Sequence, residues 1–291
     1  MRSYRTSLRM RAFERNRWIT GEGRENLSVI APKAEKVSGT RPEGVRDERE
    51  AAAHVRQMFA AIAPRYDFLN HLLSFSLDRM WRGRTVRRFA HILSKPEARI
   101  LDVCSGTGDL AFALDRQRAS LLDDESASQR LPVFASDFVE PMLERAAEKA
   151  RRRACVTVFA AADTLQLPFS DASFDLLTTA FGFRNLANYE AGLREFARVL
   201  KRGGELGILE FTEPRKGLLA GVFRFYFQRI LPRIGGAVSG NKAAYAYLPG
   251  SVAKFPLPEE LAALLRAVGF GDVRVASWNF GSVILYTGRR I

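Results

Sequence analysis

The segment Arg99-Ile-Leu-Asp-Val-Cys-Ser-Gly-Thr-Gly-Asp-Leu110 combines an apolar strand, a sharp turn and the start of a helix. Its pattern predicts a buried parallel strand over 100–103 and a helix that begins at Asp109. Glycines at such a turn let a ligand lie against the backbone amides, although many such turns are only tight connections. The turn lacks the third glycine of the dinucleotide fingerprint, and no P-loop lysine follows it.

Acidic residues lie at or just beyond the ends of the predicted strands. Asp102 would repel phosphate and attract an amino-bearing ligand. S-adenosylmethionine carries an ammonium, a sulfonium and a ribose but no phosphate, and it fits this preference. Asp137 ends a second strand over 131–137, where it is placed either to accept the hydroxyls of a ribose or to cap the following helix. Asp163, in the loop 161–169, is placed to accept a hydrogen bond from an adenine amine.

Strand and helix patterns alternate along most of the chain, which predicts a doubly wound α/β fold. Residues 115–131, which are charged and small, interrupt the alternation and are predicted to be a surface insertion. The chain closes with a helix and two strands that are predicted to form a β-hairpin. The further strands are expected over 156–159, 174–180, 205–211, 272–278 and 281–287, and the further helices over 141–153, 189–200 and 258–268.

Composition limits the partners. The 291 residues have a net charge of +13 and 47% hydrophobic residues, which fits one α/β domain with an anionic partner: nucleic acid, an acidic membrane surface, or merely a solubilising coat. The two cysteines lack metal-ligand spacing, so we expect no metal site and a reducing cytoplasm. The sequence has no apolar run of about 18 residues that could span a membrane.

Two segments stand outside the alternation. Residues 1–45 are predicted to be a disordered basic leader or, alternatively, a basic arm for lipid or RNA, ahead of a domain over 46–291. Residues 214–258 contain seven basic residues and no acidic one, and their first half predicts a basic amphipathic helix. Such a helix lies on an anionic membrane or covers an apolar ligand site, or it simply packs with its charges in water.

Several motifs together resemble the UbiE/MenG class of quinone-biosynthesis C-methyltransferases. They are Tyr66-Asp-Phe-Leu-Asn70, Leu101-Asp-Val-Cys-Ser-Gly-Thr-Gly-Asp109, Phe181-Gly-Phe-Arg-Asn185 and Leu231-Pro-Arg-Ile-Gly235. The resemblance runs from about residue 50 to residue 288. It implies the class I S-adenosylmethionine-dependent methyltransferase fold, which is Rossmann-like, with a seven-stranded sheet and a C-terminal β-hairpin. The cofactor positions that the family implies fall on Thr107, Asp137, Asp163 and Thr164; the glycine turn adds Asp102, Gly106 and Gly108.

The resemblance implies methylation of a ring carbon in a prenylated hydroquinone, with demethylmenaquinol to menaquinol as the expected reaction. The alternatives are the ubiquinone precursor 2-methoxy-6-polyprenyl-1,4-benzoquinol and an RNA acceptor. A ring carbon becomes a good nucleophile when a phenolic hydroxyl loses its proton, so the enzyme must stabilise a phenolate. Arg184 and Asn185, at a strand end, are the candidates for this role.

The remaining catalytic candidates come from residues 66–71. The proton acceptor is expected to be a water held by Arg184, or His71 or Asp67, although a lone histidine is also often just a packed residue. Tyr66 is expected to orient the ring, as is Tyr245. The lipid tail of the substrate implies a cytoplasmic protein bound peripherally to the inner face of the cell membrane, as a homodimer or in a biosynthetic complex. No nucleic-acid partner is expected, because an Asn/Asp-Pro-Pro-Tyr motif is absent.

Overall fold

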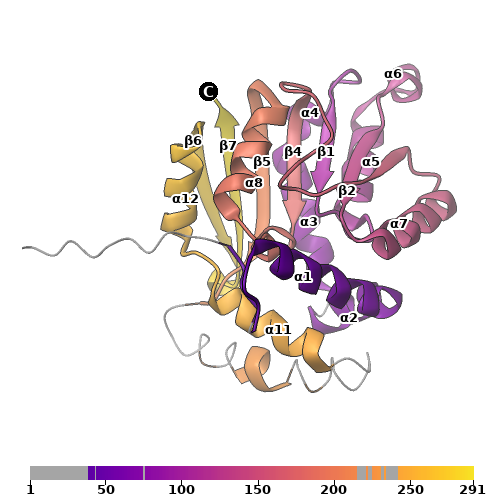
Figure 1. Ribbon diagram of the computed structural model, residues 1–291. Helices are drawn as coiled ribbons and strands as arrows, with labels where there is room; N and C mark the ends of the chain where they lie inside the picture. The colour runs from indigo at the N-terminus through magenta and orange to yellow at the C-terminus, as the bar shows by residue number, and fades with distance from the viewer. Residues whose placement is uncertain are drawn as a thin grey trace, which may run out of the picture. The chain divides into compact units, whose positions relative to one another are not determined.

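The computed structural model describes residues 39–42, 44–74, 76–214, 221, 225–230, 233 and 242–291. They form a seven-stranded sheet of order β3-β2-β1-β4-β5-β7-β6 (Figure 1). The first five strands pair in parallel, and β7 runs antiparallel between β5 and β6. The doubly wound sheet and the C-terminal hairpin are therefore confirmed. The strands are β1 (Ile100–Val103), β2 (Val133–Asp137), β3 (Thr157–Ala161), β4 (Phe174–Ala180), β5 (Leu200–Phe211), β6 (Phe270–Trp278) and β7 (Val283–Arg290).

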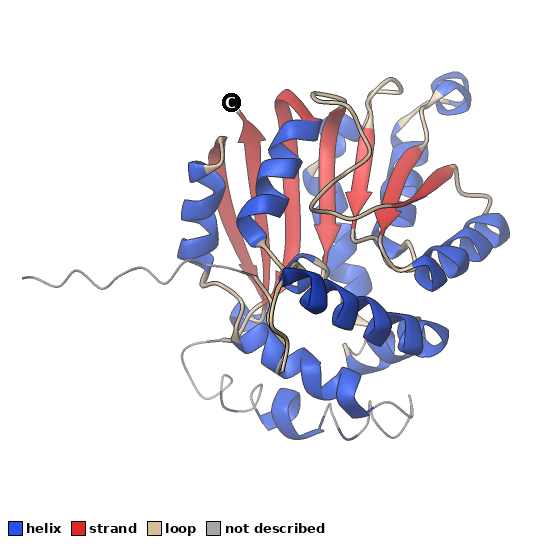
Figure 2. Cartoon of the chain, in the orientation of Figure 1, coloured by secondary structure: helices blue, strands red, loops and turns tan. Residues whose placement is uncertain are grey.

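Helices cover both faces of this sheet, with α8 and α12 on one face and α4 and α5 on the other (Figures 1 and 2). Successive residues of β1 point to opposite faces, so Ile100 packs with α4 and α5 while Leu101 packs with α8 and α12. The helices are α1 (Glu48–Ile62), α2 (Tyr66–Leu73), α3 (Leu77–Arg88), α4 (Ala90–Leu93), α5 (Asp109–Leu121), α6 (Asp124–Gln129), α7 (Glu140–Arg153), α8 (Tyr189–Val199), α11 (Lys242–Ala253) and α12 (Pro258–Ala267).

The prediction of a surface insertion over 115–131 is wrong for its first residues, which continue α5 and include the buried Asp115 and Arg118, whereas most of residues 119–129 are exposed. Helix α5 continues to Leu121, and α6 follows it directly. Arg118 is fully buried because its guanidinium donates to three backbone carbonyls, those of Leu131 at 2.8 Å, Lys95 at 3.0 Å and Pro96 at 2.6 Å. A charged residue that finds such partners can point inward, and a sequence pattern alone does not reveal them.

The described chain begins earlier than the expected domain start at residue 46. The Thr40 amide donates to the Leu186 carbonyl at 2.8 Å, and the Arg41 guanidinium donates to the Ala187 carbonyl at 2.6 Å. Gly39 has a φ of 124°, and a Cβ there would lie 2.2 Å from the Ala187 oxygen. Residues 39–42 therefore form a strap against the loop that follows β4.

The expectations for residues 1–38 lie outside the described residues, as does most of the amphipathic helix expected in the first half of 214–258. Its described part includes the π-helical turn η3 (Tyr226–Ile230). The sequence pattern did not foresee α11, in the second half of that segment. Among the described residues, helices are too short or too polar to cross a membrane.

Candidate active site

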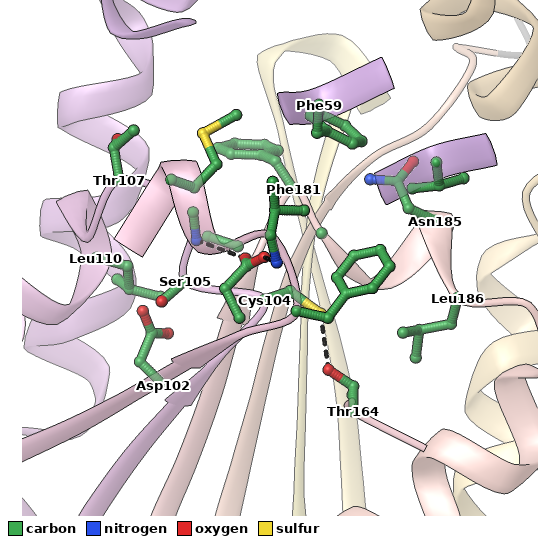
Figure 3. A pocket seen from close by; sticks show the side chains of 18 of the residues that line it. Phe59, Asp102, Cys104, Ser105, Thr107, Leu110, Thr164, Phe181, Asn185 and Leu186 are labelled. Carbon is green, nitrogen blue, oxygen red and sulfur yellow. Dashed lines mark hydrogen bonds between the residues drawn. The ribbon is translucent and has the colours of Figure 1, made fainter. Parts of the chain in front are cut away.

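A pocket opens at the carboxyl ends of β1, β2 and β4, where α1 and α2 cover the sheet edge (Figures 1 and 3). In parallel α/β sheets this edge is where ligands bind. Phe59 of α1 and Asn185 border one side of the pocket in Figure 3, and Asp102 borders the other. The predicted site residues that line the pocket are Tyr66, Asp102, Gly106, Thr107, Asp137, Asp163, Thr164 and Asn185. Among the residues that the structure describes around it, Gly108, His71 and Arg184 are not in its lining.

The glycine turn is built as its sequence predicts. Gly106 and Gly108 have positive φ angles of 55° and 84°. A Cβ on Gly108 would also lie 2.8 Å from the Phe112 ring. Gly108 therefore serves the turn by conformation rather than by touching a ligand, because only glycine adopts this backbone shape without strain in so little space.

Asp137 ties the turn to the end of β2. Its two carboxylate oxygens accept hydrogen bonds from the Gly106 amide at 2.8 Å and the Val139 amide at 2.9 Å. Burial raises the pKa of Asp137 to about 6, although these hydrogen bonds act to lower it. Each oxygen keeps a second lone pair, so the carboxylate can still accept the hydroxyls of a ribose.

Asp102 is the pocket's incompletely satisfied carboxylate. Its Oδ1 accepts a hydrogen bond from the Thr178 hydroxyl at 2.8 Å, whereas Oδ2 is buried without a hydrogen-bond partner in the described structure. Burial raises the pKa of this group to about 7. A buried polar atom without a partner is costly, and an ammonium group on a ligand would relieve that cost.

A lysine holds the start of α5 in place. Lys149 of α7 donates to Asp109 at 2.7 Å, to Asp67 at 2.8 Å and to the Thr107 hydroxyl at 3.1 Å. The Thr107 hydroxyl in turn donates to Asp67. Asp67, a candidate proton acceptor, is thus engaged with a cation and a hydroxyl. Thr107 is fixed beside the pocket, and Lys149 had no signal in the sequence pattern.

The loop after β3 supplies two further candidates. Thr164 is buried, and its hydroxyl lies 3.3 Å from the Cys104 thiol (Figure 3). Asp163 is exposed and accepts a hydrogen bond from the Leu165 amide at 2.9 Å. Burial raises the pKa of Cys104 well above its ordinary value, so the thiol stays neutral.

These residues fit S-adenosylmethionine. The unpartnered oxygen of Asp102 suits an ammonium group, and Asp137 suits a ribose, as expected for a cofactor that carries both. In the described lining of the pocket, four carboxylates outnumber one arginine, Arg82, which is itself paired with Asp78 and Asp109, and this balance disfavours a nucleotide phosphate.

Arg184 lies behind the pocket wall. It is 5% exposed, and its Nη1 donates to Glu210 at 2.8 Å and to the Phe181 carbonyl. Its Nε lies 3.4 Å from the Ser251 hydroxyl, and its own backbone amide donates to Glu210 at 3.1 Å. Glu210, fully buried at the end of β5, was not foreseen, because the pairing depends on the neighbouring strands β4 and β5.

Asn185 lines the pocket, and residues that are not in the pocket lining hold its side chain in place. Its Oδ1 accepts a hydrogen bond from the Tyr247 hydroxyl of α11 at 3.2 Å, and that hydroxyl lies 3.1 Å from the Thr40 hydroxyl of the strap. The Asn185 amide nitrogen is left to donate toward a ligand. Tyr66 also lines the pocket and packs edge-on against Phe59 with ring centroids 6.0 Å apart, and burial raises the pKa of Tyr66.

His71 belongs to a charged cluster below the pocket. Its Nδ1 lies 2.9 Å from Asp78, which also accepts from the Ser74 hydroxyl at 2.8 Å and pairs with Arg82. Burial acts to raise the pKa of Asp78, but Arg82, Ser74 and His71 outweigh it and hold the pKa below its ordinary value. The donor atoms of His71, Asp78 and Asp109 lie within 4.8 Å of one another, and the Arg82 guanidinium contacts both carboxylates, as a bound cation would.

Comparison with solved structures places the fold. A possible histamine N-methyltransferase from Thermotoga maritima, described as SAM-dependent, superposes with a TM-score of 0.55 at 19% identity, over 81% of this chain and 99% of that one. A SAM-dependent methyltransferase from Aquifex aeolicus superposes with a TM-score of 0.53 at 18% identity, over 77% of this chain and 98% of that one. The sheet order and the pocket at its carboxyl edge thus define a class I methyltransferase fold.

The sequence places the chain more narrowly. The profile of the ubiE/COQ5 methyltransferase family matches residues 45–290, and the chain belongs to this family. It is similar to the demethylmenaquinone methyltransferase of Deinococcus radiodurans, at 46% identity over 84% of this chain and 95% of that protein. It is also similar to the demethylmenaquinone methyltransferase of Thermus thermophilus, at 48% identity over 80% of this chain and 100% of that protein. A third similar protein is that of Geobacter sulfurreducens named ubiquinone/menaquinone biosynthesis C-methyltransferase UbiE, at 40% identity over 83% of this chain and 90% of that protein. The expected family and the methyltransferase activity are confirmed.

Proposed function

We propose that the protein transfers a methyl group from S-adenosylmethionine to a ring carbon of a prenylated hydroquinone, converting demethylmenaquinol to menaquinol. The observation that carries the acceptor is the 46–48% identity, over nearly their whole length, to two proteins named demethylmenaquinone methyltransferase. The benzoquinol precursor of ubiquinone is the second candidate, because relatives at 37–40% identity are named for both pathways.

The pocket supports this assignment because one part of its lining is acidic and another part is apolar. Carboxylates gather at the ends of β1 and β2, where they suit the polar groups of the cofactor. Apolar side chains gather on the side of α1, where they suit an aromatic ring that carries a lipid tail. The apolar residues of this wall and of the segments around it are Val55, Phe59, Phe138, Met142, Phe181 and Leu186.

The reaction needs an acceptor that is activated at carbon. A phenolic O–H of the quinol loses its proton to water, and the phenolate charge makes the adjacent ring carbon nucleophilic. When bound, S-adenosylmethionine supplies a methyl group whose bond to sulfur breaks as the bond to the ring carbon forms. Loss of the ring proton then restores the aromatic ring as a phenolate, which takes up a proton from water, so the methylated quinol, S-adenosylhomocysteine and one net proton are the products.

The residues of this chain act mainly by positioning. Asn185 is placed to donate to a quinol oxygen, and Tyr66 is placed to hold the ring edge-on beside Phe59. Arg184 is not in the pocket lining and its guanidinium pairs with Glu210, so its proposed role is to fix the backbone of the loop that carries Asn185. His71 and Asp67 are held by ion pairs and hydrogen bonds, so a water molecule is the favoured proton acceptor.

The same proposal includes a membrane surface as partner. The acceptor's isoprenoid tail resides in a bilayer, so the enzyme must reach its substrate there. The described residues Phe225, Arg229, Ile230 and Arg233 line a surface hollow in which an exposed phenylalanine lies beside two exposed arginines. Anionic lipid attracts surfaces of this composition, which supports a peripheral location at the inner face of the cell membrane.

Methyl transfer tests the proposal directly. The full chain is incubated with methyl-labelled S-adenosylmethionine and, in separate reactions, with demethylmenaquinol, the demethylated benzoquinol precursor and bulk RNA. We expect label in menaquinol. Arg184→Ala is expected to lose most activity because the loop is released, whereas Arg194→Ala, at an exposed ion pair, is expected to keep it. Transfer to RNA alone, or to none of the three, would overturn the proposal.

A further inference from the structure

A second arginine, Arg82 of α3, lies in the pocket wall. Among the pocket-lining residues that the structure describes, it is the one lysine or arginine, and it shares the lining with four aspartates: Asp102, Asp109, Asp137 and Asp163. We propose that Arg82 is the cation that stabilises the phenolate of the acceptor, an inference that rests on the proposed C-methylation of a quinol.

The aspartates of the pocket disfavour a phenolate, and besides the sulfonium of a bound cofactor, Arg82 is the cation that the described lining residues offer. Carboxylates repel a developing phenolate and so raise the barrier to its formation. A guanidinium in a partly enclosed site offsets this repulsion, because it is permanently charged and donates directional hydrogen bonds. The side chain of Arg82 is 11% exposed, so water screens its charge only weakly.

Arg82 is held for this task on three sides. Its Nη1 pairs with Asp78, one helical turn earlier on α3, and lies 3.8 Å from Asp109 at the start of α5. Its guanidinium also lies over the Phe181 ring, with Cζ 5.7 Å from the ring centroid. The Phe181 ring in turn stacks on the Phe211 ring, with the two ring centroids 4.3 Å apart. A charged group whose position is fixed beforehand costs little reorganisation when the phenolate forms.

The guanidinium of Arg82 retains donors for a ligand. Its contacts to carboxylates within the described part of the chain use Nη1, which leaves Nε and Nη2 to reach a substrate oxygen. The guanidinium of Arg184 does not offer donors to the pocket in this way, because Glu210, Ser251 and a backbone carbonyl contact it behind the pocket wall. Lys149 differs as well, because two aspartates and a hydroxyl surround its ammonium.

Steady-state kinetics with demethylmenaquinol test the inference in the full chain. Arg82→Gln is expected to lower kcat by about 10²–10³-fold, the usual effect of removing a group that stabilises a developing anion, and to change KM much less. Arg82→Lys keeps the charge and is expected to recover most of that loss. Arg88→Gln, at an exposed position on the same helix, is the matched control and is expected to match the wild type.

The pH profile separates this role from a structural one. A cation beside the phenolate lowers the pKa of the bound quinol, so in Arg82→Gln the rise of kcat with pH should move to more alkaline pH. The same shift should appear without turnover. With 1-naphthol bound in the presence of S-adenosylhomocysteine, the absorbance of naphtholate should develop at lower pH in the wild type than in the variant.

Loss of folding must be kept distinct from loss of chemistry. Arg82→Gln leaves the buried Asp78 without its guanidinium, so the double variant Asp78→Asn, Arg82→Gln removes that unpaired charge and should fold as the wild type does. If the folded double variant keeps wild-type kcat and an unmoved pH profile, the inference fails. If the wild type itself methylates neither quinol, the proposed function fails instead, and the two results are distinguishable.

Discussion

Burial sets the protonation of individual carboxyl groups in the pocket. Asp102 and Asp137 end adjacent parallel strands, and desolvation raises their pKa values to about 7 and about 6. Near neutral pH, Asp102 therefore lies close to its midpoint, while Asp137 is mostly ionised. An ammonium group beside Asp102 favours the ionised form, so ligand binding and the ionisation of Asp102 are coupled.

This coupling predicts a pH-dependent affinity for S-adenosylhomocysteine, which carries the same ammonium as the cofactor. The group that must ionise has a pKa of about 7, so binding is tight above pH 7 and weakens as the pH falls. Between pH 8 and pH 6, Kd should rise about tenfold through Asp102, and about twofold more through Asp137. Isothermal titration calorimetry measures this directly.

Asp102→Asn isolates the contribution of Asp102. The variant should bind more weakly at pH 8, and its Kd should rise only about twofold between pH 8 and pH 6, because Asp137 alone still titrates there. An unchanged tenfold dependence in the variant would show that another group is responsible. Asp124→Asn, at an exposed position on α6, is the control and should behave as the wild type.

Residues next to strand ends were predictable, and residues joined across the fold were not. Asp102 and Asp137 follow from their places beside the glycine turn and at the end of β2, whereas the family resemblance implied Thr107. Glu210 and Tyr247 were missed because their partners, Arg184 and Asn185, lie 26 and 62 positions away, so that only the strand order and the docking of α11 bring them together. No local pattern carries that information.

At the scale of elements, periodicity located most strands and helices to within a few residues. β1 and β4 match their expected bounds because buried parallel strands are short apolar runs between turn residues. The pattern failed at the start of 115–131, where the charged side chain of Arg118 faces inward. The guanidinium there acts as a clamp that joins α5 to the segments before β1 and β2.

The clamp predicts a large cost for its removal. Arg118→Met fills similar space but leaves three backbone carbonyls with a lost donor, and we expect it to lower the free energy of unfolding by about 3 kcal/mol. Urea denaturation followed by circular dichroism measures this change. Arg116→Met, on the exposed side of the same helix, should stay within about 0.5 kcal/mol of the wild type. Equal stability of the two variants would refute the clamp.

At the scale of the whole molecule, the net charge of +13 is unevenly divided along the chain. Residues 1–36 contain nine lysines and arginines against four glutamates, so the remaining residues still carry a substantial excess of positive charge. A pocket that serves a lipid-borne acceptor benefits from an electrostatic attraction that brings it to the bilayer. Either part of the chain could supply this attraction, and a truncation distinguishes them.

Sedimentation with vesicles tests where the attraction resides. The full chain is expected to bind phosphatidylcholine vesicles that contain phosphatidylglycerol, to lose this binding in high salt, and to ignore vesicles of phosphatidylcholine alone. A chain that lacks residues 1–36 should keep most of the binding, because the described strap from Gly39 onward and the basic hollow at Arg229 and Arg233 both remain. Arg229→Glu with Arg233→Glu should weaken it, whereas Arg266→Glu, at an exposed position on α12, which packs on one face of the sheet, should not. Binding that disappears entirely with residues 1–36 would assign the membrane contact to the leader instead. In that case the hollow would have no part in delivering the substrate to the pocket.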